Sequence, residues 1–138
     1  MGSNLFKKQE GDLGESIAVR YLIEHGFTIL ERNFRIRGGE IDIIALESEK
    51  TGEEVLAFIE VKTRRSSEFG TPLEAITYWK LKSLIKTAQF YKLKHPQLPE
   101  QLRIDAIAII LNSDNKPTSI ELVKNISKDS TARQVPKL

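Results

Sequence analysis

A strand-like segment of the chain carries acidic and basic side chains in an arrangement that could do chemistry. In residues 55–64, VLAFIEVKTR, side chains alternate between two faces, so Glu60 and Lys62 share one face at the end of an apolar run. Charged groups beside a core must be paired or bound to a ligand. Two such residues alone are also compatible with a solvated strand end that carries an incidental ion pair.

A second carboxylate favours a functional interpretation. Asp42 lies between isoleucines in residues 40–47, EIDIIALE, which read as the strand before. If the two strands pair, Asp42 and Glu60 approach each other, and their repulsion requires a cation or a shared proton. Oxygen ligands without a neighbouring His or Cys favour Mg²⁺ or Mn²⁺ over zinc. Lys62 could then position a water and offset charge on a phosphate, although a structural ion-pair network produces the same pattern.

Glu15 is the third carboxylate of interest, and its pattern alone favours a structural role. Residues 12–25 have helical periodicity and end before Gly26, a typical residue at a helix C-terminus. With Asp12 as N-cap, Glu15 falls at the third helical position, where a carboxylate stabilises the helix start.

The remaining periodicity predicts an α/β fold with a mixed β-sheet flanked by helices, in the order α-β-β-β-α-β-(β). A two-residue hairpin is expected at Gly38-Gly39, and a helix is expected to start at Thr71-Pro72. We expect one domain over 1–138, with a core at about 10–123 and a polar, frayed tail at 124–138. The other predicted elements are a strand at 27–37, interrupted near Arg32-Asn33, strands at 40–47, 55–64, 102–110 and 119–123, and continuation of the second helix to about Lys94.

Composition narrows the class of protein. The 138 residues contain no cysteine, which excludes disulfides and thiolate metal sites. No apolar run approaches the roughly 20 residues of a membrane span, and we expect a cytoplasmic protein without a membrane partner. Residues 1–60 hold 7 Lys/Arg against 12 Asp/Glu (−5), whereas residues 61–94 hold 8 against 2 (+6). This distribution fits carboxylates that collect a metal and cations that meet phosphates, but also one solvated helix face.

Two longer runs resemble a known family. GDLGESIAVRYLIEHGFTILERNFRIRGGEIDIIA and FIEVKTRRSSEFGTPLEAI are similar to the YraN-like family of small bacterial proteins. That family is regarded as predicted endonucleases of the restriction-endonuclease-like superfamily, related to archaeal Holliday-junction resolvases. The motifs are GE-x-x-A around Glu15, GEID around Asp42 and EVK-x-R around Glu60, within a resemblance that covers roughly Glu10 to Tyr91.

The resemblance implies roles for individual residues. Asp42 and Glu60 would bind the metal, and Lys62 would be the catalytic lysine. Glu15 would be the additional acidic residue of resolvase-like members, a further metal ligand and catalytic residue of the same site. It therefore also implies a restriction-endonuclease-like fold.

Other charged and aromatic residues have weaker assignments. Four arginines are candidates for phosphate contact: Arg35 and Arg37 beside the Gly-Gly turn, and Arg64 and Arg65 after Lys62. We interpret Lys80, Lys82 and Lys86 as a solvated helix face, Asp105 as a structural acid paired with Arg103 or a backbone donor, and Tyr78 and Trp79 as packing or dimer contacts.

Three functions are consistent with these residues. The first is a Mg²⁺- or Mn²⁺-dependent endonuclease acting on DNA rather than RNA, with branched DNA or Holliday junctions as candidate substrates. The others are a non-catalytic nucleic-acid-binding module and a structural protein whose carboxylates form an ion-pair network. Cleavage of two strands would favour a symmetric homodimer.

Overall fold

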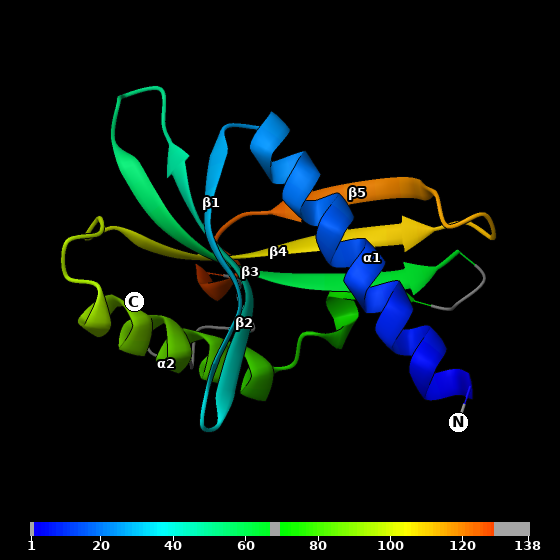
Figure 1. Cartoon of the computed structure of the whole chain (residues 1–138). Coiled ribbons are helices and arrows are strands. Elements are labelled where there is room, and N and C mark those ends of the chain that lie inside the picture. Colours follow the sequence, from blue (N-terminus) through cyan, green and yellow to red (C-terminus); the bar gives the residue numbers. More distant parts are fainter. Residues whose placement is uncertain (1, 67–69, 129–138) are drawn as a thin grey trace.

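A computed structural model describes residues 2–66 and 70–128 of the chain. Helices α1 and α2 cover opposite faces of a five-stranded mixed sheet (Figure 1), so the α/β class and the predicted element order are confirmed. The elements are α1 (Gly2–Glu24), β1 (Phe27–Ile36), β2 (Gly39–Ser48), β3 (Glu54–Arg65), the 3₁₀ helix η1 (Pro72–Ala75), α2 (Tyr78–Lys94), β4 (Leu102–Leu111), β5 (Pro117–Val123) and the 3₁₀ helix η2 (Ile126–Lys128).

The sheet has the order β1-β2-β3-β4-β5, and only its β3–β4 pair is parallel. Parallel neighbours require a crossover connection, which here contains η1 and α2. Two apolar cores result. On one face α2 packs against residues such as Ile44, Phe58 and Ile104, and on the other α1 packs through Ala18 and Leu22. The expected burial of β4 on both faces is therefore confirmed.

Helix α1 begins at Gly2, ten residues before the predicted start at Asp12. Asp12 is an exposed residue inside the helix, so the N-cap interpretation of Asp12 and the capping role of Glu15 are wrong. The extension lacks the apolar stripe that predicts a helix. It is held instead by Glu10, which is 7% exposed and lies 3.0 Å from Nε of Arg65 on β3.

The second helix is divided in two. Thr71 and Pro72 do begin a helical turn, with Glu74 completing a capping box, but η1 ends at Ala75. Ile76 has an extended backbone, and α2 starts afresh after Thr77, whose side chain accepts a hydrogen bond from the Lys80 amide (3.1 Å). A second N-cap therefore interrupts a helical period that reads as continuous in the sequence.

The β1–β2 hairpin turns at Arg37-Gly38 rather than at Gly38-Gly39, because Gly39 already pairs with Ile36. Gly38 has a φ of +87°, which favours glycine. Gly39 is needed for a different reason, since a Cβ there would lie 2.1 Å from Oγ1 of Thr87 on α2. The predicted interruption of β1 near Arg32-Asn33 is confirmed by Asn33, whose φ of +55° lies in the left-handed region, and a register shift lies earlier, between Ile29 and Glu31.

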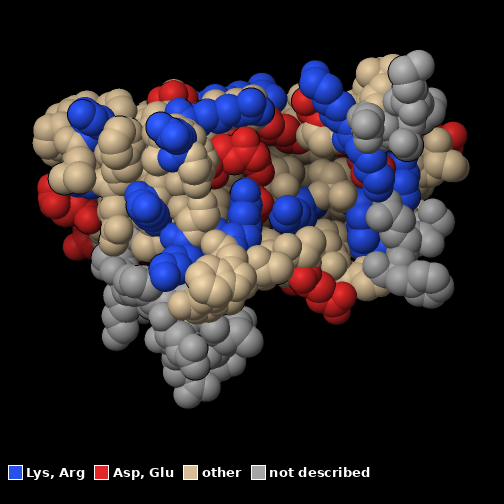
Figure 2. Space-filling view, turned by 90° about the horizontal axis from the view of Figure 1, so that it is seen from below, with Lys and Arg blue, Asp and Glu red and all other residues tan. Residues whose placement is uncertain are grey.

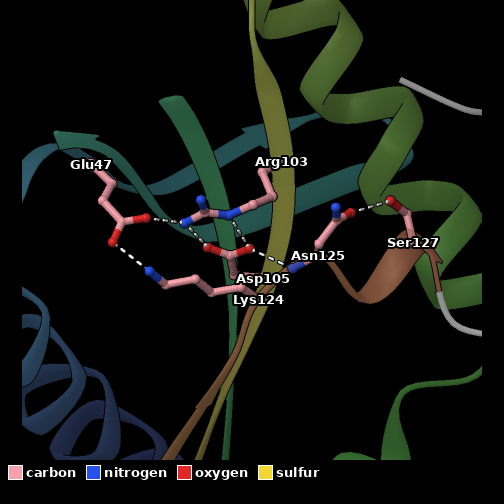
Figure 3. Close-up of polar contacts among 6 residues, drawn as sticks. All are labelled: Glu47, Arg103, Asp105, Lys124, Asn125 and Ser127. Atoms are coloured by element: carbon pink, nitrogen blue, oxygen red, sulfur yellow. Dashed lines mark hydrogen bonds and ion pairs between the residues drawn. The ribbon is translucent and has the colours of Figure 1, made fainter. Parts of the chain in front are cut away.

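A buried polar network holds the start of β4 (Figure 3). Asp105 is fully buried and accepts two hydrogen bonds from Arg103, both 2.8 Å, and one from the Asn125 amide, 2.9 Å. Arg103 also binds Glu47 at 2.6 Å, and Lys124 binds the other oxygen of Glu47. The structural role predicted for Asp105 is confirmed, with both expected kinds of partner.

The same network positions the start of the predicted tail. Asn125 is bound to Asp105, and Ile126 packs against the core on the α2 face, so residues 125–128 are held rather than frayed. Residues 129–138, the rest of the predicted tail, lie outside the described residues.

Two glycines of α1 give opposite predictions for stability. A Cβ at Gly14 would lie 1.9 Å from Oγ1 and 2.9 Å from Cβ of Thr63 on β3, so Gly14→Ala should destabilise the fold by about 1–3 kcal/mol. A Cβ at Gly11 meets nothing within 4 Å, so Gly11→Ala should stabilise the helix by about 0.5–1 kcal/mol. Urea unfolding of both variants tests this, and equal stability of the two would contradict the close packing of α1 on β3.

Candidate functional site

The site begins where β2 and β3 separate. Their registered pairing ends at Ile43 opposite Ile59, and beyond it the Val61 amide donates to Oδ2 of Asp42 (2.8 Å). A carboxylate thus takes the place of a backbone carbonyl in the ladder. Figure 1 shows β2 continuing toward the hairpin tip while β3 runs under α1. The two strands form a fork, and Asp42 lies in it.

The fork also explains a departure from the predicted alternation in β2. Ile41 and Ile43 should share a face, but Ile41 packs in the core beneath α2, whereas Ile43 packs beneath α1. The regular alternation fails at Asp42, between them, because β2 leaves its register with β3 at this point.

Asp42 and Glu60 come together across the fork, on adjacent antiparallel strands. Burial raises the pKa of Asp42 to about 7, and repulsion by the Glu60 carboxylate contributes. A hydrogen bond between the two carboxyl groups also raises this pKa, while the Val61 amide and Lys80 lower it. Two carboxyl groups in contact cannot both ionise at low cost, so near neutral pH the pair retains a proton or requires a cation.

Two lysines approach the acidic pair from different elements. Oε2 of Glu60, a residue that is 3% exposed, lies 3.4 Å from Nζ of Lys62 on β3 and 3.5 Å from Nζ of Lys80 on α2. The predicted proximity of Glu60 and Lys62 is confirmed. The assignment of Lys80 to a solvated helix face is wrong, because the first turn of α2 is directed at the fork. Lys82 and Lys86 are exposed, as expected.

A cavity of about 430 Å³ opens beside the fork. Its lining combines acids with cations, and Figure 2 shows Lys and Arg side chains around a hollow whose walls carry acidic side chains. Helix α1, the end of β1, and β2 and β3 at the fork form this cavity through Lys7, Lys8, Glu10, Gly11, Asp12, Glu15, Arg35, Asp42, Val61, Lys62 and Thr63.

Glu15 reaches the same cavity but has partners of its own. Its side chain accepts hydrogen bonds from Nε of Arg32 and Nδ2 of Asn33, both 3.0 Å, and the residue is 8% exposed. Asn33 has a φ of +55°, in the left-handed region. Gly14 and Ala18 of the GE-x-x-A motif explain how Glu15 is placed, because both allow α1 to approach the sheet closely.

The donor set fits a divalent cation of the Mg²⁺ type held by two carboxylates. Within residues 2–66 and 70–128, no three His, Cys, Asp or Glu side chains are grouped closely enough to hold a metal together. Mg²⁺ typically takes one or two carboxylates and completes its shell with water and substrate phosphates. The contact between Asp42 and Glu60, with the raised Asp42 pKa, is the repulsion that such an ion relieves.

The four arginines predicted to contact phosphate have different environments. Arg35 lines the cavity and lies 3.3 Å from Glu40, and Arg37 is exposed at the hairpin turn. Arg64 donates to the Arg65 carbonyl (2.9 Å), and Arg65 binds Glu10 and the Asn112 carbonyl. Arg65 thus connects β3 to α1 and to the residue that follows β4. Phosphate contact by any of the four arginines stays a prediction.

Sequence reasoning did not identify Lys7, Lys8 and Lys80 as site residues. Lys8 precedes Glu15 by seven residues, which is about two helical turns, so the two share a side of α1. This spacing becomes informative only when the helix is known to begin at Gly2.

No helix in the described part of the chain combines the length and apolarity needed to cross a membrane. Residues 14–109 match the family described as "Uncharacterised protein family UPF0102". A "UPF0102 protein" of Clostridium tetani is 43% identical over 122 residues, covering 88% of this chain and 96% of that protein. Relatives of the same description in Clostridium botulinum strain Hall and Caldicellulosiruptor bescii are 46% and 41% identical, covering 86% of this chain and 93% and 96% of those proteins. The chain therefore belongs to the UPF0102 family, in agreement with its resemblance to YraN-like proteins.

Proposed function

We propose that this chain is a Mg²⁺- or Mn²⁺-dependent endonuclease of the restriction-endonuclease-like superfamily that hydrolyses phosphodiester bonds in DNA. The observation that carries the proposal is the contact between Asp42 and Glu60 in the fork, where the pKa of Asp42 is raised to about 7. A pair of acids in contact, with Glu60 buried and Asp42 half-buried, costs stability beside an open cavity, and a divalent cation offsets that cost. An acid pair is also unexpected in a module that only binds phosphates.

The residues around the pair suit phosphoryl chemistry. A divalent cation held by Asp42 and Glu60 would supply a bound water of lowered pKa and a Lewis acid for a phosphate oxygen. Lys62 contacts Glu60 and also lines the cavity. Its ammonium can therefore contact the scissile phosphate and offset the negative charge that develops there. Lys80 reaches the same carboxylate oxygen of Glu60 from α2, which orients the carboxylate.

The rim of the cavity supports a polyanionic substrate. Arg35, Lys7 and Lys8 line it from β1 and α1, where cations attract a phosphate backbone and position it over the acids. Glu15 is already neutralised by Arg32, and we assign it a supporting place in the same site. DNA is the proposed nucleic acid, with branched DNA including Holliday junctions as the structure-selective substrate.

The closest rival is a nucleic-acid-binding module that retains the fold without cleavage. The positive charge that Lys7, Lys8 and Arg35 give to the rim of the cavity fits both functions. Only the endonuclease explains why two acids lie where phosphates would bind. The two are separated by incubating purified protein with linear, flapped and four-way-junction DNA, with Mg²⁺, with Mn²⁺ and with EDTA.

We expect strand cleavage with Mg²⁺ or Mn²⁺ and none with EDTA, while binding in EDTA weakens steeply with salt as counterions are released. Binding that depends on salt, without cleavage of any DNA in either metal, would replace the endonuclease with the binding module.

A further inference from the structure

The first turn of α2 exposes the only tryptophan of the chain. Trp79 is 71% exposed, so it is not a packing residue within the described part of the molecule, and the alternative expectation of a dimer contact stays a prediction. Its ring lies edge-on to Tyr78, with centroids 5.0 Å apart, and Nζ of Lys82 lies 5.5 Å from its centroid. Such a ring is a large apolar surface flanked by a cation.

Trp79 is adjacent to the acidic site. The next residue, Lys80, reaches Oε2 of Glu60 at 3.5 Å, and consecutive Cα atoms are only about 3.8 Å apart. Successive side chains of a helix diverge by about 100°, so Trp79 projects from the first turn of α2 toward a different side than Lys80. A strand of substrate that extends from Glu60 across the start of α2 would meet the exposed indole ring.

The positive charge of α2 indicates which kind of partner would bind the exposed ring of Trp79. The helix contains five lysines and no Asp or Glu, and the exposed Lys82 and Lys86 follow Trp79 at spacings of three and seven, on one helical side. In a symmetric contact between two copies, each lysine row would face its own equivalent or lie close to it, and like charges would repel. A nucleic acid brings phosphates for the lysines and a base for the ring.

We propose that Trp79 is a stacking platform for an unpaired nucleobase on the ring face opposite Lys82, whose ammonium lies over the ring and would contact the neighbouring phosphate. The inference rests on the proposed endonuclease and specifies its substrate as DNA with a single-stranded segment at the site of cleavage. In a duplex, bases stack on one another and do not present a free face, whereas flaps, junction openings and ends do.

Because Trp79 is the sole tryptophan, its fluorescence reports stacking directly. The full chain in EDTA is titrated with a single-stranded oligothymidylate and with a duplex of equal length, at fixed ionic strength. We expect the single strand to quench the emission to a saturating limit. Duplex binding, followed by the anisotropy of a labelled strand, should leave the emission nearly unchanged.

Substitutions test the affinity. Trp79→Ala should weaken single-strand binding by about 5- to 100-fold and leave duplex binding within about twofold, while Trp79→Phe should retain most of the affinity. Phe90→Ala, which removes another partly exposed aromatic of α2 farther from the fork, is the matched control and should change neither affinity substantially.

Three outcomes would overturn the inference: single-strand binding without quenching, a Trp79→Ala variant that binds the single strand normally, or an emission shift caused by protein concentration alone. The last would assign Trp79 to contact with a second copy. The titration in EDTA measures binding alone, so its result is independent of the cleavage assay with Mg²⁺ or Mn²⁺. Quenching in a protein that cleaves no DNA in that assay would contradict the endonuclease and keep the base platform. Cleavage by a protein without quenching would keep the endonuclease and contradict the base platform.

Discussion

Asp42→Ala and Glu60→Ala should each lower the proposed DNA cleavage by on the order of 10³-fold or more, while DNA binding in EDTA should persist or tighten. The loss is expected because each substitution removes one of the two carboxylates proposed to hold the cation, whose contribution to the transition state is worth several kcal/mol. Binding should not fall, because without metal each carboxylate repels the phosphate backbone. Single-turnover cleavage and anisotropy of a labelled DNA measure the two effects separately.

Lys62→Ala divides the roles within the site. It should lower cleavage to a similar extent but leave the stabilisation by Mn²⁺ largely intact, since the ammonium is proposed to meet the phosphate rather than the metal. Glu121→Ala on the edge strand β5 and Lys116→Ala before it remove exposed charges that form no ion pair with Asp42 or Glu60 in the described part of the chain, and they serve as controls. Cleavage by Asp42→Ala and Glu60→Ala at the parental rate would place any nuclease activity outside this site.

The parts of the site that lie on regular strands were predictable from sequence. Period-two alternation placed Glu60 beside Lys62, and an acid between isoleucines singled out Asp42, because a charge at a core position needs an explanation. The antiparallel pairing of their strands followed from the short connections. The same kind of argument identified Asp105 as a buried structural acid.

The parts that depend on tertiary contacts were not predictable. The first half of α1 has no apolar stripe, and the ion pair that holds it, Glu10 with Arg65, joins residues far apart in the chain. Lys80 is one of five lysines in α2, and only the docking of that helix directs it to Glu60. The fork itself is a loss of register at Asp42, which alternation cannot reveal because the pattern assumes continuous pairing.

The contact between Asp42 and Glu60 should make the metal-free protein less stable at alkaline pH than the variant Asp42→Asn, which has the same shape but no charge at position 42. The pKa of Asp42 is raised from 3.8 to about 7 in the folded state, so between about pH 4 and pH 7 the folded chain holds a proton that the unfolded chain has released. The stability that Asp42 contributes is complete below its unfolded pKa of 3.8 and is lost as the pH rises through its folded pKa of about 7. Asp42→Asn is neutral at every pH, can still accept from the Val61 amide, and can donate to Glu60.

We therefore expect Asp42→Asn to match the parent near pH 4 and to exceed its free energy of unfolding by about 1–3 kcal/mol at about pH 8.5. Urea unfolding in EDTA at several pH values measures this, with Glu121→Gln on β5 as the control for loss of an exposed carboxylate. Adding Mn²⁺ at about pH 8.5 should then stabilise the parent and not the variant. In the parent a bound cation would take the place of the lost proton and offset the repulsion between the Asp42 and Glu60 carboxylates. A variant less stable than the parent at alkaline pH would mean that Asp42 is a structural partner of Val61 and Lys80. That result would contradict the proposal that the fork is a metal site whose two acids repel each other.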